Sequence, residues 1–412
     1  MKRNVYLLLL AIACMSVIPM PTEAQFLKKL GKTLESVAKA GENANSQSAP
    51  TRSSSTNNGP RYKIHETANT KKMILRGGAS ELCPFSCGVA LVNPQNGQWF
   101  VIDKQGNKLF ELPQGYKPCS KEFNSQRLLI VSSGNYIIID TNGQIVKDLG
   151  KLQEASGFVD GVACIVKMQN SQRKTFYIDQ DGKTISSTLP YSKLYNLKDG
   201  MRIFGKGNGG PYGYCDEKCN IVIPAQYKNV EHFYNGLAPV QNNEGLWGFI
   251  DKTGRWIIEP QFSNFPTAFE GPYSMVKDKS GKIYFMDKQG KFVWKQSDDN
   301  NIDIRAFLSN GFAIWTFDGA RNTALINSQF KVHAMIKSDN MWFGNGELVD
   351  YNDQYFQWKW GGAVSLVDWN GNTLMEFDSD YTTFSDGMFN KGSSCYFNDK
   401  GEIVIKFEDT QF

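Results

Sequence analysis

Short apolar runs separated by polar turns recur along the chain from about residue 61 to its end. In one run, Trp247 and Phe249 fall on one face of an extended segment and Ile250 falls on the other. The next run, Trp256 to Ile258, again places apolar side chains on both faces. Successive side chains of a strand point to opposite faces, so a strand that is apolar on both is covered on both. The pattern therefore predicts short β-strands packed between neighbouring sheets.

A four-residue turn that starts with Asp or Asn separates the paired runs. The Asp carboxylate accepts hydrogen bonds from backbone amides, and Gly at the fourth position adopts a left-handed conformation without a Cβ clash. We therefore expect type I turns closed by a glycine bulge, joining antiparallel strands. The clearest turns are Asp103 to Gly106, Asp251 to Gly254 and Asp287 to Gly290; others begin at Asp140, Asp179 and Asp368, and degenerate copies begin at Asp216, Asn327 and Asn398.

The turns begin 30 to 41 residues apart, and a second mark, Phe-x-x-Gly, precedes many of them, as at Phe85, Phe158 and Phe384. Each unit of about 37 residues offers three short strands, and so small a unit cannot bury two faces alone. We expect an all-β array of about nine three-stranded units over residues 61–412. A β-propeller is the favoured arrangement, and an open β-solenoid is the alternative.

The two ends of the repeat region suggest how the array closes. The last unit ends at Ile403 to Phe407 with no full outer strand after it, while residues 61–82 precede the first unit. We predict that residues 61–82 supply the missing strand and close a ring. Met73 to Leu75 would then lie beside the C-terminus.

The most regular unit resembles a known family. The segments Gly236 to Val240, Trp247 to Gly254 and Ile258 to Phe262 resemble the WG-repeat family of bacterial proteins, which are often exported. The resemblance extends over most of residues 85–412, although only this region is close to the consensus. It implies a propeller-like β-repeat scaffold with an interaction-related role and no known catalytic residues.

Residues 1–24 are typical of a signal peptide. Lys2 and Arg3 precede the apolar run Val5 to Ala13, and Thr22 to Ala24 forms a small-x-small cleavage site. Residues Leu10 to Cys14 loosely resemble a lipobox, so a lipid tether at Cys14 is the alternative. We expect an exported protein, periplasmic or extracellular, or alternatively an envelope lipoprotein.

Two further segments precede the repeats. Leu27, Leu30 and Leu34 have helical spacing, so residues 25–42 are predicted to form an amphipathic helix. Residues 43–60, rich in Asn, Ser, Thr and Gly, are predicted to be a disordered linker. No later segment reaches about 18 uninterrupted apolar residues, so we expect no transmembrane segment in the mature chain.

Charge and cysteine content narrow the expected partners. The 45 basic and 41 acidic residues are interspersed, which argues against nucleic-acid binding. In an oxidising compartment the spacings suggest two local disulfides, Cys215–Cys219 across a hairpin end and Cys83–Cys87. Zinc favours C-x2-C spacing and convergent histidines, and the chain has three scattered histidines, so no metal site is expected.

The sequence offers little sign of catalysis. Gly205 to Gly210 matches G-x-G-x-x-G but lacks the following helix that a dinucleotide site requires, so no cofactor is expected. No carboxylate pair or G-x-S-x-G motif stands out, and no catalytic residue is predicted.

An aromatic segment supplies the only candidate ligand contacts. Tyr355, Trp358 and Trp360 would stack on sugar rings or anchor a protein, although their alternation equally fits one buried strand face. We expect a non-enzymatic scaffold or binding protein for an unknown protein or glycan. The alternatives are a carbohydrate-active enzyme on a propeller and an adhesin-like surface component.

Overall fold

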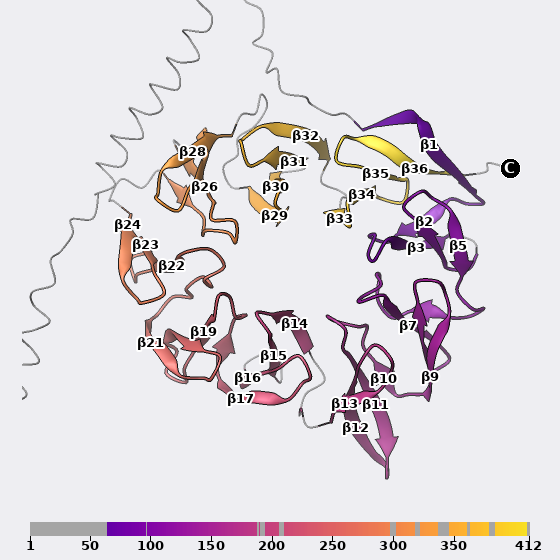
Figure 1. Cartoon of the computed structure of the whole chain (residues 1–412), viewed down its shortest axis with the longest axis horizontal. Helices are drawn as coiled ribbons and strands as arrows, with labels where there is room; N and C mark the ends of the chain where they lie inside the picture. Colours follow the sequence, from indigo (N-terminus) through magenta and orange to yellow (C-terminus); the bar gives the residue numbers. More distant parts are fainter. Residues whose placement is uncertain are drawn as a thin grey trace, which may run out of the picture.

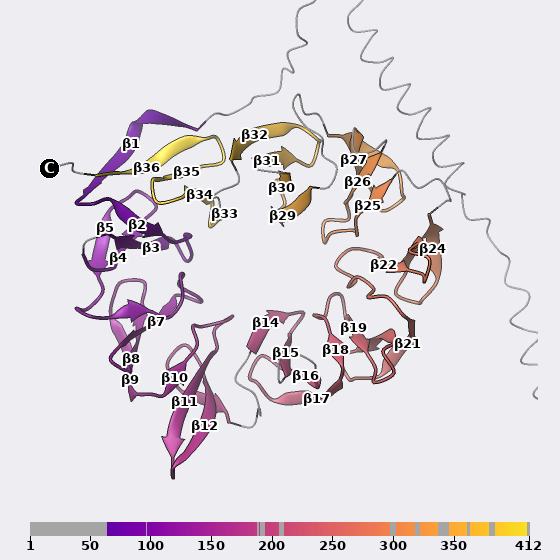
Figure 2. The same cartoon turned by 180° about the vertical axis from the view of Figure 1, so that it is seen from behind.

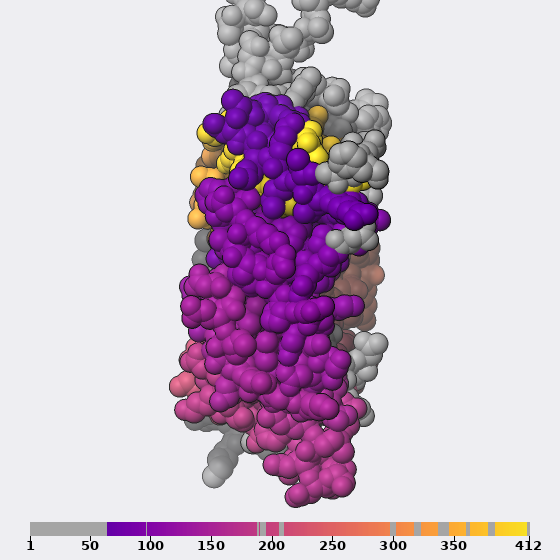
Figure 3. Space-filling model, turned by 90° about the vertical axis from the view of Figure 1, so that its right-hand side faces the viewer, coloured from indigo at the N-terminus to yellow at the C-terminus, as the bar shows by residue number. Residues whose placement is uncertain are grey.

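The described residues form nine β-sheets that follow one another around a ring, the arrangement of a nine-bladed β-propeller (Figures 1 and 2). Seen from the side the ring is narrow (Figure 3). The computed structural model describes residues 64–95, 97–187, 189, 194–205, 210–296, 302–317, 322–336, 346–360, 363–378 and 384–409. The predicted signal peptide, amphipathic helix and linker lie outside these residues. The expectation of an all-β propeller is confirmed.

The blades follow the chain order, and each takes consecutive strands. Blade 1 is formed by β2 (Ala79–Leu82), β3 (Val89–Pro94), β4 (Phe100–Asp103) and β5 (Lys108–Glu111). Blade 2 is formed by β6 (Lys117–Pro118), β7 (Arg127–Ser132), β8 (Asn135–Asp140) and β9 (Ile145–Lys151). Blade 3 is formed by β10 (Glu154–Ala155), β11 (Ala163–Gln169), β12 (Gln172–Ile178) and β13 (Thr184–Ser186).

The middle blades continue the same order. Blade 4 is formed by β14 (Leu194–Lys198), β15 (Met201–Gly205), β16 (Tyr212–Cys215) and β17 (Ile221–Tyr227). Blade 5 is formed by β18 (Asn229–Val230), β19 (Leu237–Gln241), β20 (Trp247–Asp251) and β21 (Trp256–Phe262). Blade 6 is formed by β22 (Ser274–Lys277), β23 (Ile283–Met286) and β24 (Phe292–Lys295).

The last three blades complete the ring. Blade 7 is formed by β25 (Asp303–Ile304), β26 (Ala313–Phe317), β27 (Asn322–Ile326) and β28 (Val332–Met335). Blade 8 is formed by β29 (Glu347–Tyr351), β30 (Tyr355–Trp360), β31 (Ala363–Asp368) and β32 (Thr373–Asp378). Blade 9 is formed by β33 (Phe384–Ser385), β34 (Met388–Lys391), β35 (Cys395–Phe397) and β36 (Glu402–Asp409), with β1 (His65–Leu75) added beside β36.

Most blades have one strand more than the three that the sequence pattern predicted. The additional strand comes first in its blade and lies toward the centre of the ring, as β14, β29 and β33 do (Figure 1). It is often very short: β18 contains Asn229 and Val230 alone. Two residues are too few to show strand alternation, so this element left no periodic signal in the sequence.

The predicted Asp-x-x-Gly turns are confirmed. At Asp251 the carboxylate accepts hydrogen bonds from the amides of Thr253 and Arg255, and the Gly254 amide donates to the Asp251 carbonyl at 2.9 Å. The turns that start at Asp103 and Asp287 have the same bonds. In each of the nine described turns the fourth residue has a positive φ, even where it is Cys219 or Phe330.

Ring closure is confirmed, with one difference from the prediction. Strand β1 pairs in parallel with β36, and Met73 lies opposite Phe407 (Figure 1). Blade 9 already has four strands of its own, so β1 is a fifth, outermost strand and does not fill a vacancy. The first and last strands of the repeat region therefore hold the ring closed together.

Aromatic contacts between neighbouring blades involve both marks of the repeat at several junctions. There, the Phe of the Phe-x-x-Gly mark (Phe-x-Gly at Phe269) packs against an aromatic residue two positions before the turn of the preceding blade. The ring centroids of Phe269 and Phe249 are 5.0 Å apart, and those of Phe233 and Tyr214 are 4.7 Å apart. Across the ring closure Phe85 and Tyr396 are 4.8 Å apart. Each blade is covered by a neighbour on both sides, so its strands carry apolar residues on both faces.

Candidate binding cavity between blades 4 and 5

A cavity of about 210 Å³ opens where blade 4 meets the first strand of blade 5. Blade 4 contributes Tyr195 from β14, Ile203 from β15 and Tyr212 from β16. Blade 5 contributes residues 229–232, which are β18 and the two residues after it, and they form the opposite wall. The cavity is therefore assembled from four segments that are spread over about 40 residues of sequence.

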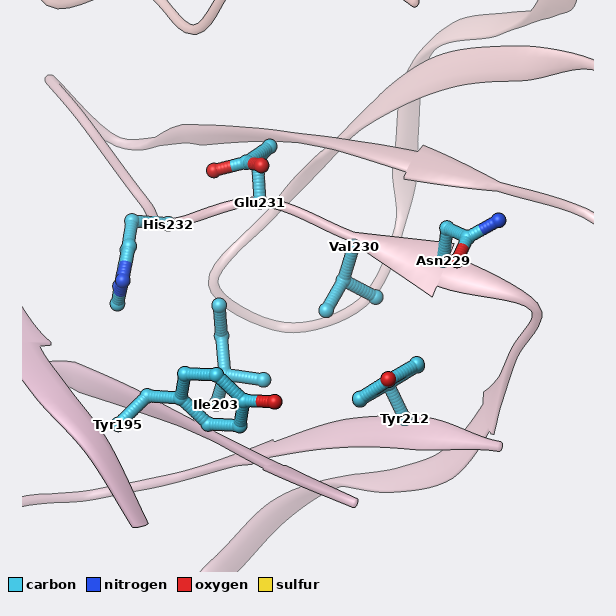
Figure 4. A pocket seen from close by; sticks show the side chains of 7 residues that line it. All are labelled: Tyr195, Ile203, Tyr212, Asn229, Val230, Glu231 and His232. Carbon is cyan, nitrogen blue, oxygen red and sulfur yellow. The ribbon is translucent and has the colours of Figure 1, made fainter. Parts of the chain in front are cut away.

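Strand alternation sorts the side chains of the blade 5 wall. Val230 and His232 point toward Tyr195 and Ile203, whereas Glu231 points to the other side of its strand (Figure 4). The Glu231 amide donates to the Pro239 carbonyl at 3.0 Å, and the buried Tyr214 hydroxyl donates to the Glu231 carbonyl at 2.6 Å. These bonds anchor the backbone from both blades and hold the wall in place.

Gly205, the first residue of the G-x-G-x-x-G match, has a packing role here. Gly205 lies opposite Tyr212 in the β15–β16 ladder. A Cβ at residue 205 would lie 2.4 Å from the Tyr212 ring, which is closer than two carbon atoms can approach. Glycine at this position therefore allows Tyr212 to lie over the strand beside the cavity.

His232 brings an unsatisfied polar atom to the cavity wall. Burial lowers the pKa of its imidazole, the Lys198 ammonium lowers it further, and Asp160 opposes the shift. The ring is therefore neutral at pH 7. Its Nδ1 is buried and lacks a hydrogen-bond partner within the described part of the chain. A buried polar atom without a partner is costly, so an incoming group that pairs with it gains that free energy.

The Glu231 carboxyl is also perturbed. Burial raises its pKa, and a hydrogen bond from the His232 amide partly offsets the shift. Glu231 therefore takes up a proton more readily than an exposed glutamate. The side of this wall that faces Tyr195 and Ile203 therefore carries a neutral imidazole, while the perturbed carboxyl points away from it (Figure 4).

A charged contact clamps the two blades beside the cavity. The Asp199 carboxylate in blade 4 accepts a hydrogen bond from the Gly236 amide at 2.6 Å and pairs with Lys252 at 2.7 Å, both in blade 5. Burial alone would raise the pKa of Asp199, but these partners hold it below its ordinary value. Asp386 makes the same two contacts, with Gly88 and with Lys104, where blade 9 meets blade 1.

The predicted ligand contacts in blade 8 are wrong for the two side chains that can be assessed. Tyr355 is 4% exposed and Trp358 is 1% exposed. Trp358 packs in a core that includes Leu325 of blade 7, and Tyr355 packs with Phe389 of blade 9. Trp360 lies at the end of β30, and its side chain is outside the described atoms. The alternation reflected a strand covered on both faces by neighbouring blades.

The cysteines are free thiols throughout the described residues. Cys83 is buried, which raises its pKa to about 12. Cys87 is exposed, and its sulfur accepts a hydrogen bond from the Gln126 amide of blade 2. The predicted Cys83–Cys87 bond is therefore absent, because Cys83 faces the core while Cys87 lies in the turn. Cys215 and Cys219 are both buried and hydrogen-bonded to each other, without a covalent bond.

The described residues contain no group of three or more His, Cys, Asp and Glu side chains arranged to hold a metal ion. They also contain no helix that is long and apolar enough to cross a membrane.

Sequence reasoning missed the cavity residues. His232 was seen only as one of three scattered histidines, and Glu231 was not singled out. Their one local signal is a pair of titratable residues directly before the Phe233 that packs into blade 4. This signal does not reveal Tyr195, Ile203 or Tyr212, which reach the cavity only through the contact between blades.

Comparison with solved structures found similarity at low sequence identity. A computationally designed protein, Ika8, is 12% identical with a TM-score of 0.40, over 73% of this chain and 99% of that one. A eukaryotic initiation factor is 10% identical with a TM-score of 0.47, over 76% and 91%. BamB from Moraxella catarrhalis is 13% identical with a TM-score of 0.33, over 71% and 94%.

Comparison of sequences locates the most regular units. No curated protein matches the chain. Residues 212–245 and 247–282 match the family described as the WG containing repeat. These residues include the second half of blade 4, with the cavity residue Tyr212, and all of blade 5. The chain is therefore a nine-bladed β-propeller that carries WG-containing repeats over residues 212–282.

Proposed function

We propose that the chain is an exported, non-catalytic binding protein, and that the cavity between blades 4 and 5 receives one sugar ring of a neutral glycan. The observation that carries the proposal is the buried Nδ1 of His232, a residue of the cavity lining, which has no hydrogen-bond partner among the described residues. The signal-like residues 1–24 support export to the periplasm or the cell exterior.

The size and lining of the cavity support a single ring as the ligand group. Its volume of about 210 Å³ is below the roughly 300–1,000 Å³ of sites that enclose drug-sized molecules. Tyr195 and Tyr212 offer aromatic surface, and Ile203 and Val230 offer aliphatic surface. Aromatic surface of this kind packs well against the apolar faces of a sugar ring.

The polar groups favour a hydroxyl-bearing ligand. A neutral imidazole nitrogen either donates or accepts a hydrogen bond, depending on the tautomer. A hydroxyl group is donor and acceptor at once, so it pairs with His232 Nδ1 in both tautomers. The neutral His232 ring supplies no charge that would attract an ionic ligand. A neutral sugar meets all of these conditions.

The lining supports binding in preference to glycoside hydrolysis. Hydrolysis requires two carboxyl groups about 5–10 Å apart on either side of the glycosidic bond. Among the seven lining residues Glu231 is the one carboxylate, and its side chain points away from Val230 and His232 (Figure 4). A carbohydrate-active enzyme is therefore the second candidate, and an adhesin-like surface component is the third.

The test is calorimetric titration of the full chain with a panel of neutral oligosaccharides. Val230→Phe fills the cavity without removing a polar group, and Ile257→Phe makes a similar change at a residue that is 41% exposed on the outer strand of blade 5. We expect saturable binding that Val230→Phe weakens at least tenfold and Ile257→Phe leaves intact.

Three results would overturn parts of the proposal. The same affinity in both variants would reject the cavity as the binding site. Absence of binding to every glycan would reject the ligand class, and a protein partner whose binding depends on Val230 would replace it. Release of reducing sugar from a bound oligosaccharide would favour the enzyme.

A further inference from the structure

The Asp turn of blade 4 departs from the repeat at two positions. Cys219 occupies the fourth position with φ +59°, a conformation that side chains disfavour and that glycine accepts. Cys215 occupies the position before the Asp, where the other eight units have a larger apolar residue: Ile102, Ile139, Ile178, Ile250, Met286, Ile326, Val367 and Phe397. The backbone conformation disfavours Cys219, and Cys215 is smaller than its counterparts, so the preferences of the repeat do not account for either residue.

The two cysteines meet in the folded blade. Both are fully buried, and their thiols are hydrogen-bonded to each other. The Cys219 amide donates to the Asp216 carbonyl at 3.0 Å, which closes the turn and brings the fourth residue back toward the end of β16. Two departures from the repeat that coincide in one turn and bring two sulfur atoms into contact point to a bond between them.

We propose that Cys215 and Cys219 are joined by a disulfide bond that staples the outer turn of blade 4 in the exported protein. The inference rests on the export that is part of the proposed function, and it is independent of what the cavity binds. The two thiols lose two protons and two electrons and form one S–S bond. The oxidant is the disulfide of a protein thiol oxidase, which is reduced to two thiols.

Arg202 favours the chemistry at this turn. It lies opposite Cys215 in the β15–β16 ladder, is fully buried, and donates to the Asp160 carbonyl at 2.7 Å. The hydrogen bond with the Cys215 thiol lowers the pKa of Cys219, and the positive charge of Arg202 lowers it further. The thiolate is the nucleophile in thiol–disulfide exchange, so Cys219 attacks the oxidant and Cys215 then resolves the mixed disulfide. Both cysteines are fully buried in the native blade, so the exchange takes place once the β15–β16 hairpin has brought Arg202 and the two cysteines together and before the neighbouring blades cover them.

The other nearby thiol makes a less suitable partner. Cys164 in β11 of blade 3 lies in the same buried cluster as Cys215 and Cys219. Burial raises the pKa of Cys164 to about 11, so it stays protonated and unreactive. Its position in another blade also means that it meets the pair only after blades 3 and 4 have docked. The bond within one turn therefore forms first.

Peptide mapping of the full chain tests the proposal. The chain is produced with export and, separately, refolded in a glutathione buffer, so that failure of export and failure of the bond are distinguished. Denatured protein is labelled with N-ethylmaleimide with and without a reductant. We expect two additional labels after reduction. Trypsin cleaves after Lys218, between the two cysteines, so the unreduced digest should contain the two flanking peptides linked through Cys215 and Cys219.

Two variants complete the experiment. Cys219→Gly restores the residue that the turn prefers, so it should fold and should lose the reductant-dependent labels. The double variant Cys83→Ser/Cys87→Ser should keep them. Equal labelling with and without reductant in both preparations would overturn the proposal, as would linkage of Cys219 to Cys164 or of Cys83 to Cys87.

Discussion

Phe330 provides a direct comparison between backbone strain and core packing. It occupies the glycine position of the blade 7 turn with φ +57°. Its ring lies in a cluster of five aromatic side chains with centroid distances of 5.2 to 6.3 Å: Tyr273, Phe285, Trp294, Phe307 and Trp315. Glycine would relieve the backbone and remove the ring, so the two effects on the free energy of unfolding oppose each other.

The magnitudes favour the ring. A left-handed conformation costs a residue with a Cβ roughly 1–2 kcal/mol. Removal of a buried Phe side chain costs roughly 3–5 kcal/mol, and Phe330 is half-buried, so its ring contributes about 2–3 kcal/mol. Phe330→Ala loses the ring and keeps the strain, so it should destabilise by about 2–3 kcal/mol. Phe330→Gly loses both and should destabilise by about 0–2 kcal/mol, less than Phe330→Ala.

Urea unfolding followed by tryptophan fluorescence measures this order, because Trp294 and Trp315 lie beside the ring. Gly254→Ala is the control for strain. The added Cβ would be 3.5 Å from Ile223, an ordinary contact, so the change should cost about 1 kcal/mol through φ alone. The reasoning is refuted if Phe330→Gly is more stable than the wild type, or if Phe330→Ala is the more stable of the two variants.

Three further predictions concern ring closure, the clamp between blades and the cavity histidine. Met73→Pro should lower the thermal midpoint and speed proteolysis of β1, because it breaks the ladder opposite Phe407; Met73→Leu should change neither. In urea unfolding Asp199→Ala should cost about 1 kcal/mol by leaving the Gly236 amide unpaired, and Asp199→Asn, which keeps an acceptor oxygen, should cost less. Burial lowers the pKa of His232 in the folded protein. Below about pH 6.5 the imidazole therefore binds a proton in the unfolded chain more readily than in the folded one, and the free energy of unfolding falls as the pH drops. Thermal midpoints between pH 7.5 and 5.5 should decline less in His232→Gln, and parallel curves would contradict the assignment.

Local chemistry made much of the scaffold predictable from the sequence. Asp251 and Gly254 form their turn through bonds within four residues, so the turn could be identified without knowledge of the fold. The two-faced apolar strands required neighbours on both sides, which predicted stacked units. Even the position of Met73 beside the C-terminus followed from an outer strand that appeared to be missing.

The functional features could not be read in the same way. Alternation at Tyr355 and Trp358 described a strand, and only the neighbouring blades decided that both side chains are buried. The additional inner strands, such as β18, are too short to show a period.

The sequence by itself determined the repeat and the turns, because each depends on contacts within a few residues or on the simple need to cover a strand. Only the tertiary structure decided where a cavity forms. Tyr195, Tyr212 and His232 line it together because Phe233 packs on Tyr214 and Asp199 clamps blade 4 to blade 5. The repeat makes every junction between blades similar, and the particular side chains that meet across this one junction leave room for a ligand.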